Sequence, residues 1–403
     1  MTPAVSIYLH IPFCIHRCAY CDFNTYAGQE SLIPAYVDTL VREIGFIGNQ
    51  LSNFPTFNIP TVFFGGGTPS LLSGPQVASV MDALRAAFAF PPDIEATLEA
   101  NPGTCSFDHL LALRKAGINR LSFGVQSANA EELRMLERAH DFFDVIQSVK
   151  WARQAGFENL NLDLIYGLPE QALASWQTTL KRALDLHPEH ISAYALTLEH
   201  GTPFGKWSSR GLLPLPDPDL AAEMYEWAGN YLESNGYIQY EISNWARDPQ
   251  PSTLNLQPKY ACRHNLRYWR GLPYLGLGAG AHGYANGIRY SNVLRIKTYI
   301  ERLTANSQSP TANFPLTPAT VNHHQQTQRD DMGEFMMTGL RLTREGVSSA
   351  EFETRFGSQL DEVYGREVEA LTRLGLLEWL AGRLMLTRRG RLLGNQVFMH
   401  FIE

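Results

Sequence analysis

Three of the five cysteines lie close together near the amino end of the chain, at Cys14, Cys18 and Cys21. They come directly after an apolar run that is typical of a strand, so one loop carries three thiols. Three thiolates on one loop can bind three corners of a cubane 4Fe–4S cluster and leave the fourth iron without a protein ligand. An iron with an open coordination position is a place for chemistry.

A zinc knuckle that uses His16 as its fourth ligand is the alternative for the same loop. Structural zinc sites usually combine two separated pairs of ligands, and this loop does not have that spacing, so the cluster is favoured. Cys105 and Cys262 are far away in sequence and are expected to be small buried apolar side chains. The sequence alone leaves open whether either of them folds near the cluster.

The composition is typical of a globular cytoplasmic protein. Of the 403 residues, 44% are hydrophobic and 18% are charged, and no apolar run approaches the ~20 residues of a membrane helix. The amino end lacks the basic-then-apolar order of a signal peptide. The net charge of -7 gives no general attraction to nucleic acid. An odd number of cysteines, three of them clustered, suits metal ligation in a reducing compartment better than disulfides.

The elements that must position these cysteines follow a strand–helix alternation from residue 4 to about 240. Six apolar runs, each followed by a helical stretch, predict six parallel strands, at residues 4–10, 61–64, 96–100, 120–125, 161–166 and 191–198. We therefore expect a partial (β/α)6-type barrel over residues 1–240. In such barrels the chemistry lies on the loops that follow the strands.

Two further segments are expected after the barrel. Residues 241–320 end in a linker rich in Pro, Ser and Asn at 304–318. Residues 321–403 are predicted to form a small winged-helix-like domain, with helices at 327–341, 349–356 and 358–374 and a hairpin that turns at Ala381 and Gly382. Residues 325–403 carry 10 basic and 12 acidic side chains, which favours a packing or lid role over DNA binding.

The cysteine pattern Cys-x3-Cys-x2-Cys after the first strand of a βα barrel resembles the radical S-adenosylmethionine (SAM) superfamily. The motifs HIPFC, CAYCDF, FFGGGTPS, EANPG, SFGVQS and DLIYGLP resemble the subfamily of oxygen-independent coproporphyrinogen III oxidase and the related HemW haem chaperones. The resemblance spans nearly the whole chain. It implies a radical SAM barrel with a 4Fe–4S cluster whose open iron takes the amino and carboxylate groups of SAM, and an electron donor such as a flavodoxin or ferredoxin.

The same resemblance implies SAM-binding residues at the ends of several strands. Gly66, Gly67 and Thr68 follow the second strand, where glycines let backbone carbonyls approach the ammonium group of SAM. Glu99 ends the third strand and is implied to hold ribose hydroxyls. The other positions implied for SAM, or for a second SAM, are Tyr8, Tyr20, Gln126, Arg138 and Asp163.

Two departures separate the branches of the subfamily. The oxidase pattern has a fourth cysteine two residues after the third, and this chain has Phe23 there, which cannot ligate iron. The run that begins at His264 resembles the HNxxYW signature of HemW. The resemblance implies that haem iron binds His264, that Tyr268 and Trp269 offer ring faces to the macrocycle, and that other candidates for the iron or the propionates are Arg267, Arg270 and His282.

The sequence therefore predicts a radical SAM haem chaperone that passes haem to haem-requiring respiratory proteins, membrane-bound ones included. A second copy of the chain is among the expected partners, and nucleic acid is not. The alternative is an oxygen-independent coproporphyrinogen III oxidase, which decarboxylates propionate side chains through a 5′-deoxyadenosyl radical. No catalytic residue is assigned, and the sequence leaves open whether the chain is an enzyme.

Overall fold

The structure, a computed structural model, describes residues 4–51, 57–249, 256–305 and 314–402. The chain forms two compact units, which are described separately below. The first comprises Met1–Ala228 and Pro273–His324, and the second comprises Gly229–Leu272 and Gln325–Glu403. Among the described residues, no helix is both long enough and apolar enough to cross a membrane.

A parallel sheet forms the centre of the first unit, as predicted. Its strands run in the order β1, β4, β5, β6, β7 and β8, and each pairs in parallel with the next. Their bounds are Ser6–Ile11, Thr61–Gly66, Glu95–Ala100, Arg120–Gln126, Asn159–Tyr166 and His190–Ala195. These are the six predicted strands, so the partial α/β barrel is confirmed.

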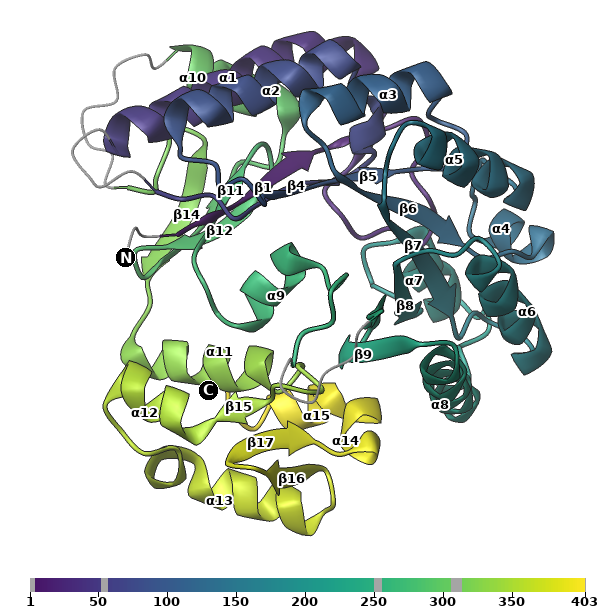
Figure 1. Cartoon of the computed structure of the whole chain (residues 1–403), viewed down its shortest axis with the longest axis vertical. Helices are drawn as coiled ribbons and strands as arrows, with labels where there is room; N and C mark the ends of the chain where they lie inside the picture. The colour runs from purple at the N-terminus through teal and green to yellow at the C-terminus, as the bar shows by residue number, and fades with distance from the viewer. Residues whose placement is uncertain (1–3, 52–56, 250–255, 306–313, 403) are drawn as a thin grey trace. The chain divides into compact units, whose positions relative to one another are not determined.

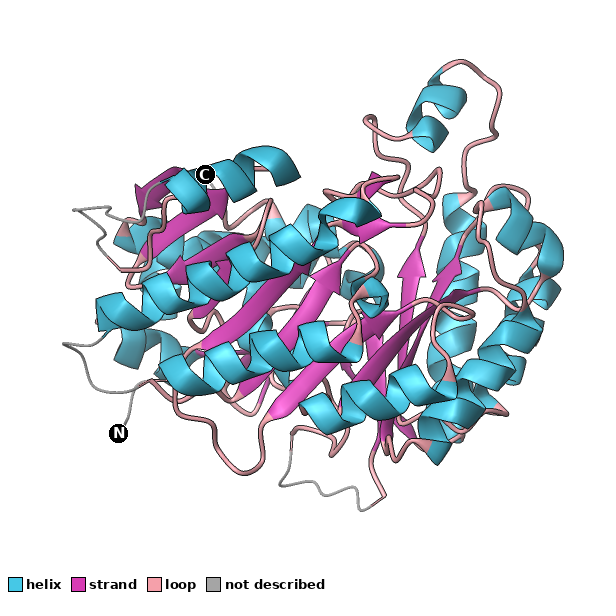
Figure 2. Ribbon diagram, turned by 90° about the horizontal axis from the view of Figure 1, so that it is seen from above, coloured by secondary structure: helices cyan, strands magenta, loops and turns pink. Residues whose placement is uncertain are grey.

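The helices that connect these strands cover the outer face of the sheet, as Figures 1 and 2 show. They begin and end at local signals in the sequence: the Ser106 side chain caps the start of α3, and Gly117 ends it with a φ of 110°. The helices along this face are α1 (Ile33–Gln50), α2 (Gly74–Ala87), α3 (Phe107–Ala116), α4 (Ala130–Met135), α5 (Phe142–Gln154) and α6 (Leu173–Leu184). Two later helices are α7 (Pro203–Ser209) and α8 (Pro218–Ser234).

The sheet of the first unit is larger than the sequence predicted. Strand β11 (Tyr274–Leu277) pairs in parallel with β1, on the side away from β4. Strands β12 (His282–Ala285) and β13 (Ile288–Asn292) follow as antiparallel neighbours, and β14 (Thr320–Gln325) lies next to β13. Helix α10 (Ile296–Ala305) packs on α1.

The two units therefore do not follow the boundaries expected from the sequence. The expected segment 241–320 is divided, because residues from Pro273 onward return to the sheet, whereas Gly229–Leu272 belong to the second unit. This return depends on pairing between β11 and β1, which are far apart in the chain. The expected linker at 304–318 falls partly outside the described residues.

The second unit contains the helices and the small sheet expected near the carboxyl end. Strands β16 (Leu377–Leu380) and β17 (Arg383–Leu386) form the predicted hairpin, and Ala381 and Gly382 make its turn with φ of 50° and 74°. The remaining strands are β9 (Tyr237–Glu241), β10 (Asn244–Arg247) and β15 (Val347–Ser348). The helices are α9 (Arg263–Trp269), α11 (Gln328–Gly339), α12 (Ser349–Phe356), α13 (Leu360–Arg373), α14 (Arg388–Leu392) and α15 (Gly394–Phe398).

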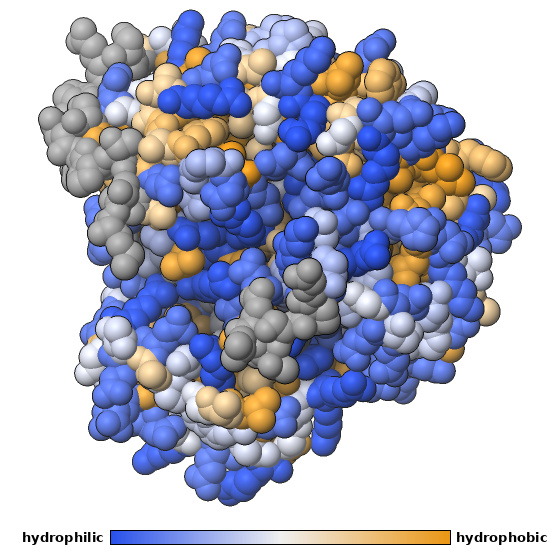
Figure 3. Space-filling model, viewed as in Figure 1, coloured by the Kyte–Doolittle hydropathy of each residue, from blue (hydrophilic) through white to orange (hydrophobic). Residues whose placement is uncertain are grey.

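The surface agrees with the composition. On the face seen in Figure 3, hydrophilic residues predominate and apolar residues lie in small groups between them. Single exposed apolar side chains are normal for a protein in water and need no special explanation. The chemistry of the molecule is therefore sought in a cavity of the first unit.

Candidate functional site

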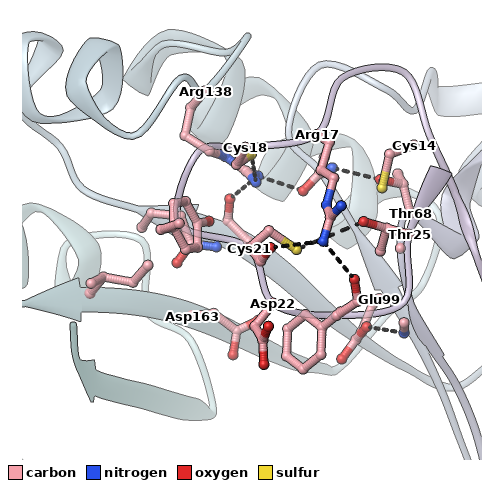
Figure 4. A pocket seen from close by; sticks show the side chains of 18 of the residues that line it. Cys14, Arg17, Cys18, Cys21, Asp22, Thr25, Thr68, Glu99, Arg138 and Asp163 are labelled. Atoms are coloured by element: carbon pink, nitrogen blue, oxygen red, sulfur yellow. Dashed lines mark hydrogen bonds between the residues drawn. The ribbon is translucent and has the colours of Figure 1, made fainter. Parts of the chain in front are cut away.

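A cavity of about 390 Å³ lies at the carboxyl ends of the strands of the first unit, and Figure 4 shows it from close by. Its volume falls in the range of roughly 300–1,000 Å³ that is usual for small-molecule sites. The three cysteines line it together with all but one of the side chains predicted for SAM, namely Tyr20, Gly66, Gly67, Thr68, Glu99, Gln126, Arg138 and Asp163. Residues from five strand ends and one loop thus meet, as the barrel topology requires.

Tyr8 is the predicted residue that does not line the cavity. Its hydroxyl lies 3.0 Å from Nδ1 of His10, and a Cβ atom on Gly65 would lie 2.9 Å from the Tyr8 ring. Tyr8 therefore packs against β4 and not into the cavity.

The cysteine loop is held in place by backbone pairing at both ends. Strand β2 (Phe13–Cys14) pairs with β3 (Tyr26–Ala27), and the amide of Tyr26 donates to the carbonyl of Pro12 at 2.8 Å. Between them, the Asn24 side chain donates to the carbonyl of Ala279 at 3.1 Å. The loop is thus fixed at its two ends and in its middle, so the three thiols are presented to one cavity (Figure 4).

The glycine turn after β4 approaches this loop so closely that side chains are excluded. A Cβ atom on Gly67 would lie 2.6 Å from the carbonyl oxygen of Phe13 and 3.0 Å from the sulfur of Cys14. Gly66 has a φ of +113°, which few residues other than glycine adopt. The turn therefore brings bare backbone to the edge of the cavity, as the sequence predicted for the approach to SAM.

The thiols suit a cluster better than a single metal ion. Among the described residues, no three His, Cys, Asp or Glu side chains converge so that they could hold one ion. Zinc needs all its ligands at about 2.0–2.3 Å from one point, whereas a cubane distributes its cysteines over different irons. His16 is engaged elsewhere, because its Nε2 lies 3.2 Å from a carboxylate oxygen of Glu137.

The protonation of the thiols is set by burial. Burial raises the pKa of Cys14 and of Cys21, and nearby hydroxyl groups, Thr68 for Cys14 and Thr25 for Cys21, act in the opposite direction. Cys105 is buried and does not line the cavity, and Cys262 is a buried residue of the second unit, so neither adds a ligand. Binding of iron must displace protons from the three thiols.

Arg138 offers a donor to a ligand in the cavity. Its Nη2 donates to the carbonyl of Gly124 at 2.8 Å, and its Nη1 lies 3.5 Å from the sulfur of Cys18. Its Nε is buried and has no hydrogen-bond partner in the described part of the chain. Buried donors normally have a hydrogen-bond acceptor, so a polar group of a bound ligand would accept a hydrogen bond from this Nε.

Two carboxyl groups face the cavity, Glu99 from β5 and Asp163 from β7, and β6 lies between these two strands. The amide of Gly66 donates to Glu99 at 3.1 Å, and Ser122 and Asn161 each donate to Asp163 at 2.8 Å. Burial, and then the charge of Asp163, raises the pKa of Glu99 to about 8, and burial also raises the pKa of Asp163. A ligand with hydroxyl or ammonium groups would stabilise the charged form of both. These residues therefore fit SAM.

Several polar residues that line the cavity were not predicted from the sequence, among them Arg17, Thr25, Asn101 and Ser122. Asn101 directly follows β5, and a polar residue at a strand end is a signal that would have found it. Ser122 lies within a strand, and only the alternation of its neighbours indicates that it faces inward. Arg17 and Thr25 lie on the loop and carry no such signal.

The predicted haem motif lies on α9 in the second unit. His264 is only 1% exposed, and its Nε2 lies 2.8 Å from the hydroxyl of Tyr268. Arg341 lies over the ring of Trp269 at 4.3 Å, and the Arg270 guanidinium forms an ion pair with Glu345. The other histidine candidate, His282, is exposed at the start of β12 in the first unit. For Nε2 of His264 to ligate haem iron, the hydrogen bond between Nε2 and the Tyr268 hydroxyl would have to break.

Comparisons with known proteins agree with this geometry. The model of the radical SAM superfamily matches residues 8–183, and the model of the HemN C-terminal domain matches residues 326–393. The chain is 38% identical to the heme chaperone HemW of Bacillus subtilis, over 98% of this chain and 99% of that protein. It is 35% identical to the heme chaperone HemW of Escherichia coli, over 99% of this chain and 98% of that protein.

A solved structure extends the likeness to the whole fold. The structure of coproporphyrinogen III oxidase (HemN) from Escherichia coli, a radical SAM enzyme, matches 99% of this chain and 90% of that chain, with a TM-score of 0.82 and 25% sequence identity. The superfamily implies a 4Fe–4S cluster and SAM, and the cavity has the thiols and strand-end groups that suit them. With near-complete coverage at more than a third identity, the chain belongs to the HemW family of heme chaperones within the radical SAM superfamily.

Proposed function

We propose that this protein is a cytoplasmic haem chaperone that binds haem and delivers it to haem-requiring respiratory proteins. Cys14, Cys18 and Cys21 would hold a 4Fe–4S cluster, and SAM would occupy the rest of the cavity. When bound and reduced by a flavodoxin or ferredoxin, the cluster supplies the electron that splits SAM into methionine and a 5′-deoxyadenosyl radical. Support for the proposal comes from the near-complete match to HemW proteins and from the lining of the cavity.

The residues of the cavity would each have a distinct part in binding. Gly66 and Gly67 carry no side chains of their own and line the cavity, so their backbone would be open to the approach of an ammonium group. Glu99 and Asp163 would accept hydrogen bonds from hydroxyl groups of the ligand, which would favour their charged forms. The free Nε of Arg138 donates to the ligand.

Within the cavity, Phe23 is the residue that favours a chaperone over the oxidase. It stands where the oxidase pattern has a fourth cysteine, lines the cavity and is 66% exposed. An exposed phenyl ring at the mouth of a cavity offers a flat apolar face, which suits contact with an aromatic macrocycle such as haem. It does not suit iron ligation or proton transfer.

Haem binding also needs an axial ligand, and the two histidine candidates differ in accessibility. His264 matches the family signature but is buried and hydrogen-bonded to Tyr268, whereas His282 is exposed. We keep His264 as the proposed ligand, with Tyr268 and Trp269 beside it, and treat His282 as the competing ligand. A histidine ligand gives haem a characteristic Soret band, so the contributions of His264 and His282 can be compared through the spectra of variants that lack one or the other.

The test is an anaerobic titration of the reconstituted protein with haem, followed by transfer to an apo-cytochrome. We expect saturable binding with a shifted Soret band, weakened at least tenfold in His264→Ala and unchanged in His282→Ala, and loss of the haem spectrum from the donor as the acceptor gains it. Weakened haem binding in His282→Ala together with unchanged binding in His264→Ala would show that His282 is the ligand. Absence of saturable binding by the wild-type protein would contradict the chaperone proposal.

A parallel assay tests the competing activity. The same preparation is incubated with coproporphyrinogen III, SAM and a reductant, without oxygen. We expect no protoporphyrinogen. Formation of that product over many turnovers would overturn the chaperone proposal in favour of the oxidase.

A further inference from the structure

A chain of hydrogen bonds connects two of the three cavity cysteines through three other side chains (Figure 4). The hydroxyl of Thr68 donates to the sulfur of Cys14 at 3.6 Å, and Nδ2 of Asn101 donates to Oγ1 of Thr68 at 2.9 Å. On the other side of Asn101, Nη2 of Arg138 donates to its Oδ1 at 2.5 Å, and Nη1 of Arg138 donates to the sulfur of Cys18 at 3.5 Å. Asn101 is the middle member of the chain.

The direction of every bond in this chain is fixed by chemistry. A guanidinium has no acceptor, so the oxygen of the Asn101 amide must face Arg138. Its NH₂ group then faces Thr68 and donates to the hydroxyl oxygen. A hydroxyl has a single proton, and because its oxygen already accepts from Asn101, that proton remains for Cys14. The amide therefore aims the Thr68 hydroxyl at the sulfur.

Separate hydrogen bonds hold the backbone next to these hydrogen-bonded side chains. The carbonyl of Asn101 accepts from both the amide and the hydroxyl of Thr104, at 3.1 and 2.6 Å. The amide of Thr68 donates to the carbonyl of Phe13 at 2.7 Å. Arg138 has a second anchor at the carbonyl of Gly124, at 2.8 Å. Loss of the Asn101 side chain would therefore release the Thr68 hydroxyl while the loop and the guanidinium stay in place.

Hydrogen bonds to cysteine sulfurs are among the determinants of the potential of an iron–sulfur cluster. A donor on the sulfur stabilises the reduced cluster, which carries one more negative charge, and therefore makes reduction easier. Thr68 and Arg138 donate to Cys14 and Cys18, and the Thr25 hydroxyl lies 3.9 Å from the sulfur of Cys21, so each cysteine has a side-chain partner at its sulfur. Outer groups that orient the ligands of a metal site also tune it, and their loss typically costs about 10- to 100-fold in metal affinity or activity.

We propose that Asn101 is a positioning residue that aims the Thr68 hydroxyl at Cys14 and thereby raises the reduction potential of the cluster. The inference deepens the proposed function, because it requires the cluster held by Cys14, Cys18 and Cys21. It does not require haem binding. Asn101 acts through Thr68, so its effect must disappear when the Thr68 hydroxyl is absent.

The test measures the midpoint potential of the reconstituted cluster by an anaerobic redox titration, with the reduced cluster observed by electron paramagnetic resonance. We expect a more negative potential in Thr68→Val and in Asn101→Ala, and a wild-type potential in Thr68→Ser, which keeps the hydroxyl. The double variant of Asn101→Ala with Thr68→Val should match Thr68→Val alone. The isosteric Asn101→Asp cannot donate to Thr68, so it should also shift to a more negative potential.

Asn119→Ala is the matched control, because Asn119 binds backbone groups of Ala96 and Ile94 and does not line the cavity. An unshifted potential in both Asn101 variants, or shifts that add fully in the double variant, would overturn the inference. If the wild-type protein assembled no cluster, the cofactor assignment would fail and the inference with it. A normal cluster without haem binding would contradict only the chaperone proposal.

Discussion

The guanidinium of Arg138 faces the sulfur of Cys18 at 3.5 Å, although 120 residues separate the two in the chain. A guanidinium is permanently charged and offers only donors, so Arg138 can meet the sulfur only as a cationic hydrogen-bond donor. Arg138 follows the fourth helix of the barrel, and Cys18 lies on the loop after the first strand. The topology of the sheet therefore places a permanent positive charge beside Cys18.

Replacement of Cys18 by alanine should prevent cluster assembly and leave the barrel folded. The Cys18 side chain is partly exposed and packs little, so the free energy of unfolding should change by about 0.5 kcal/mol or less. Iron and sulfide analysis after anaerobic reconstitution measures the loss. Cys105→Ala is the control, because Cys105 is buried outside the cavity and should retain a full cluster. A full iron and sulfide content in Cys18→Ala would remove this cysteine from the ligand set.

The stability of the ligand-free protein should fall as the pH rises from about 4.5 to about 8, partly because of Glu99. Its pKa is raised to about 8 by burial and by the charge of Asp163. The folded protein therefore binds a proton that the unfolded chain has already lost in this window, and folding becomes less favourable as that proton leaves. We expect a contribution on the order of 1 to 2 kcal/mol, since water in the open cavity screens the charge.

Urea unfolding at pH 5, 6.5 and 8 measures this effect. Glu99→Gln keeps the shape of the side chain but cannot ionise, so the decrease with pH should be smaller in this variant. Part of the decrease should remain, because burial also raises the pKa of Asp163. An identical decrease in the wild type and in Glu99→Gln would show that Glu99 does not titrate in this window. Addition of SAM should stabilise the wild type more than the variant.

The parts of the fold that could be predicted are those whose signal is local. Each strand from β1 to β8 in the parallel sheet is an apolar run in the sequence because both of its faces are covered. Cys14, Cys18 and Cys21 are close in the chain, so their loop was evident without a structure. Gly66, Glu99 and the other strand-end residues were placed through the resemblance, and the structure brings all but Tyr8 to one cavity.

The parts that could not be predicted depend on pairing between distant segments. Strand β11 is a run of only four residues, Tyr274–Leu277, and its parallel pairing with β1 joins segments that are far apart in the chain. The same holds for Asn101, whose side chain gains its partners from two other loops. Short runs and single polar residues carry too little pattern to indicate which distant segment they contact.

Glu43 is a charged residue on the apolar face of α1, and its burial is explained by four donors. Tyr299 and the amide of Gly278 donate to one carboxylate oxygen, at 2.7 and 2.8 Å, and Asn292 and Thr317 donate to the other, both at 2.9 Å. The donors lie 235 to 274 residues away in sequence. Glu43 therefore fastens the late segment of the first unit to the first helix.

Replacement of Glu43 by alanine should destabilise the first unit by at least ~3 kcal/mol, because each buried donor left without an acceptor costs about 1–3 kcal/mol. Glu43→Gln keeps one acceptor oxygen and should have a smaller effect, about half as large. Burial raises the pKa of Glu43, so a neutral amide is a close substitute. The free energy of unfolding in urea, followed by circular dichroism, gives the ranking. Glu301→Ala, an exposed change on α10, is the control with an expected effect within about 0.5 kcal/mol. Equal stability of Glu43→Ala and this control would mean that the four donors find water, and that β11 and α10 are held to α1 by apolar packing alone.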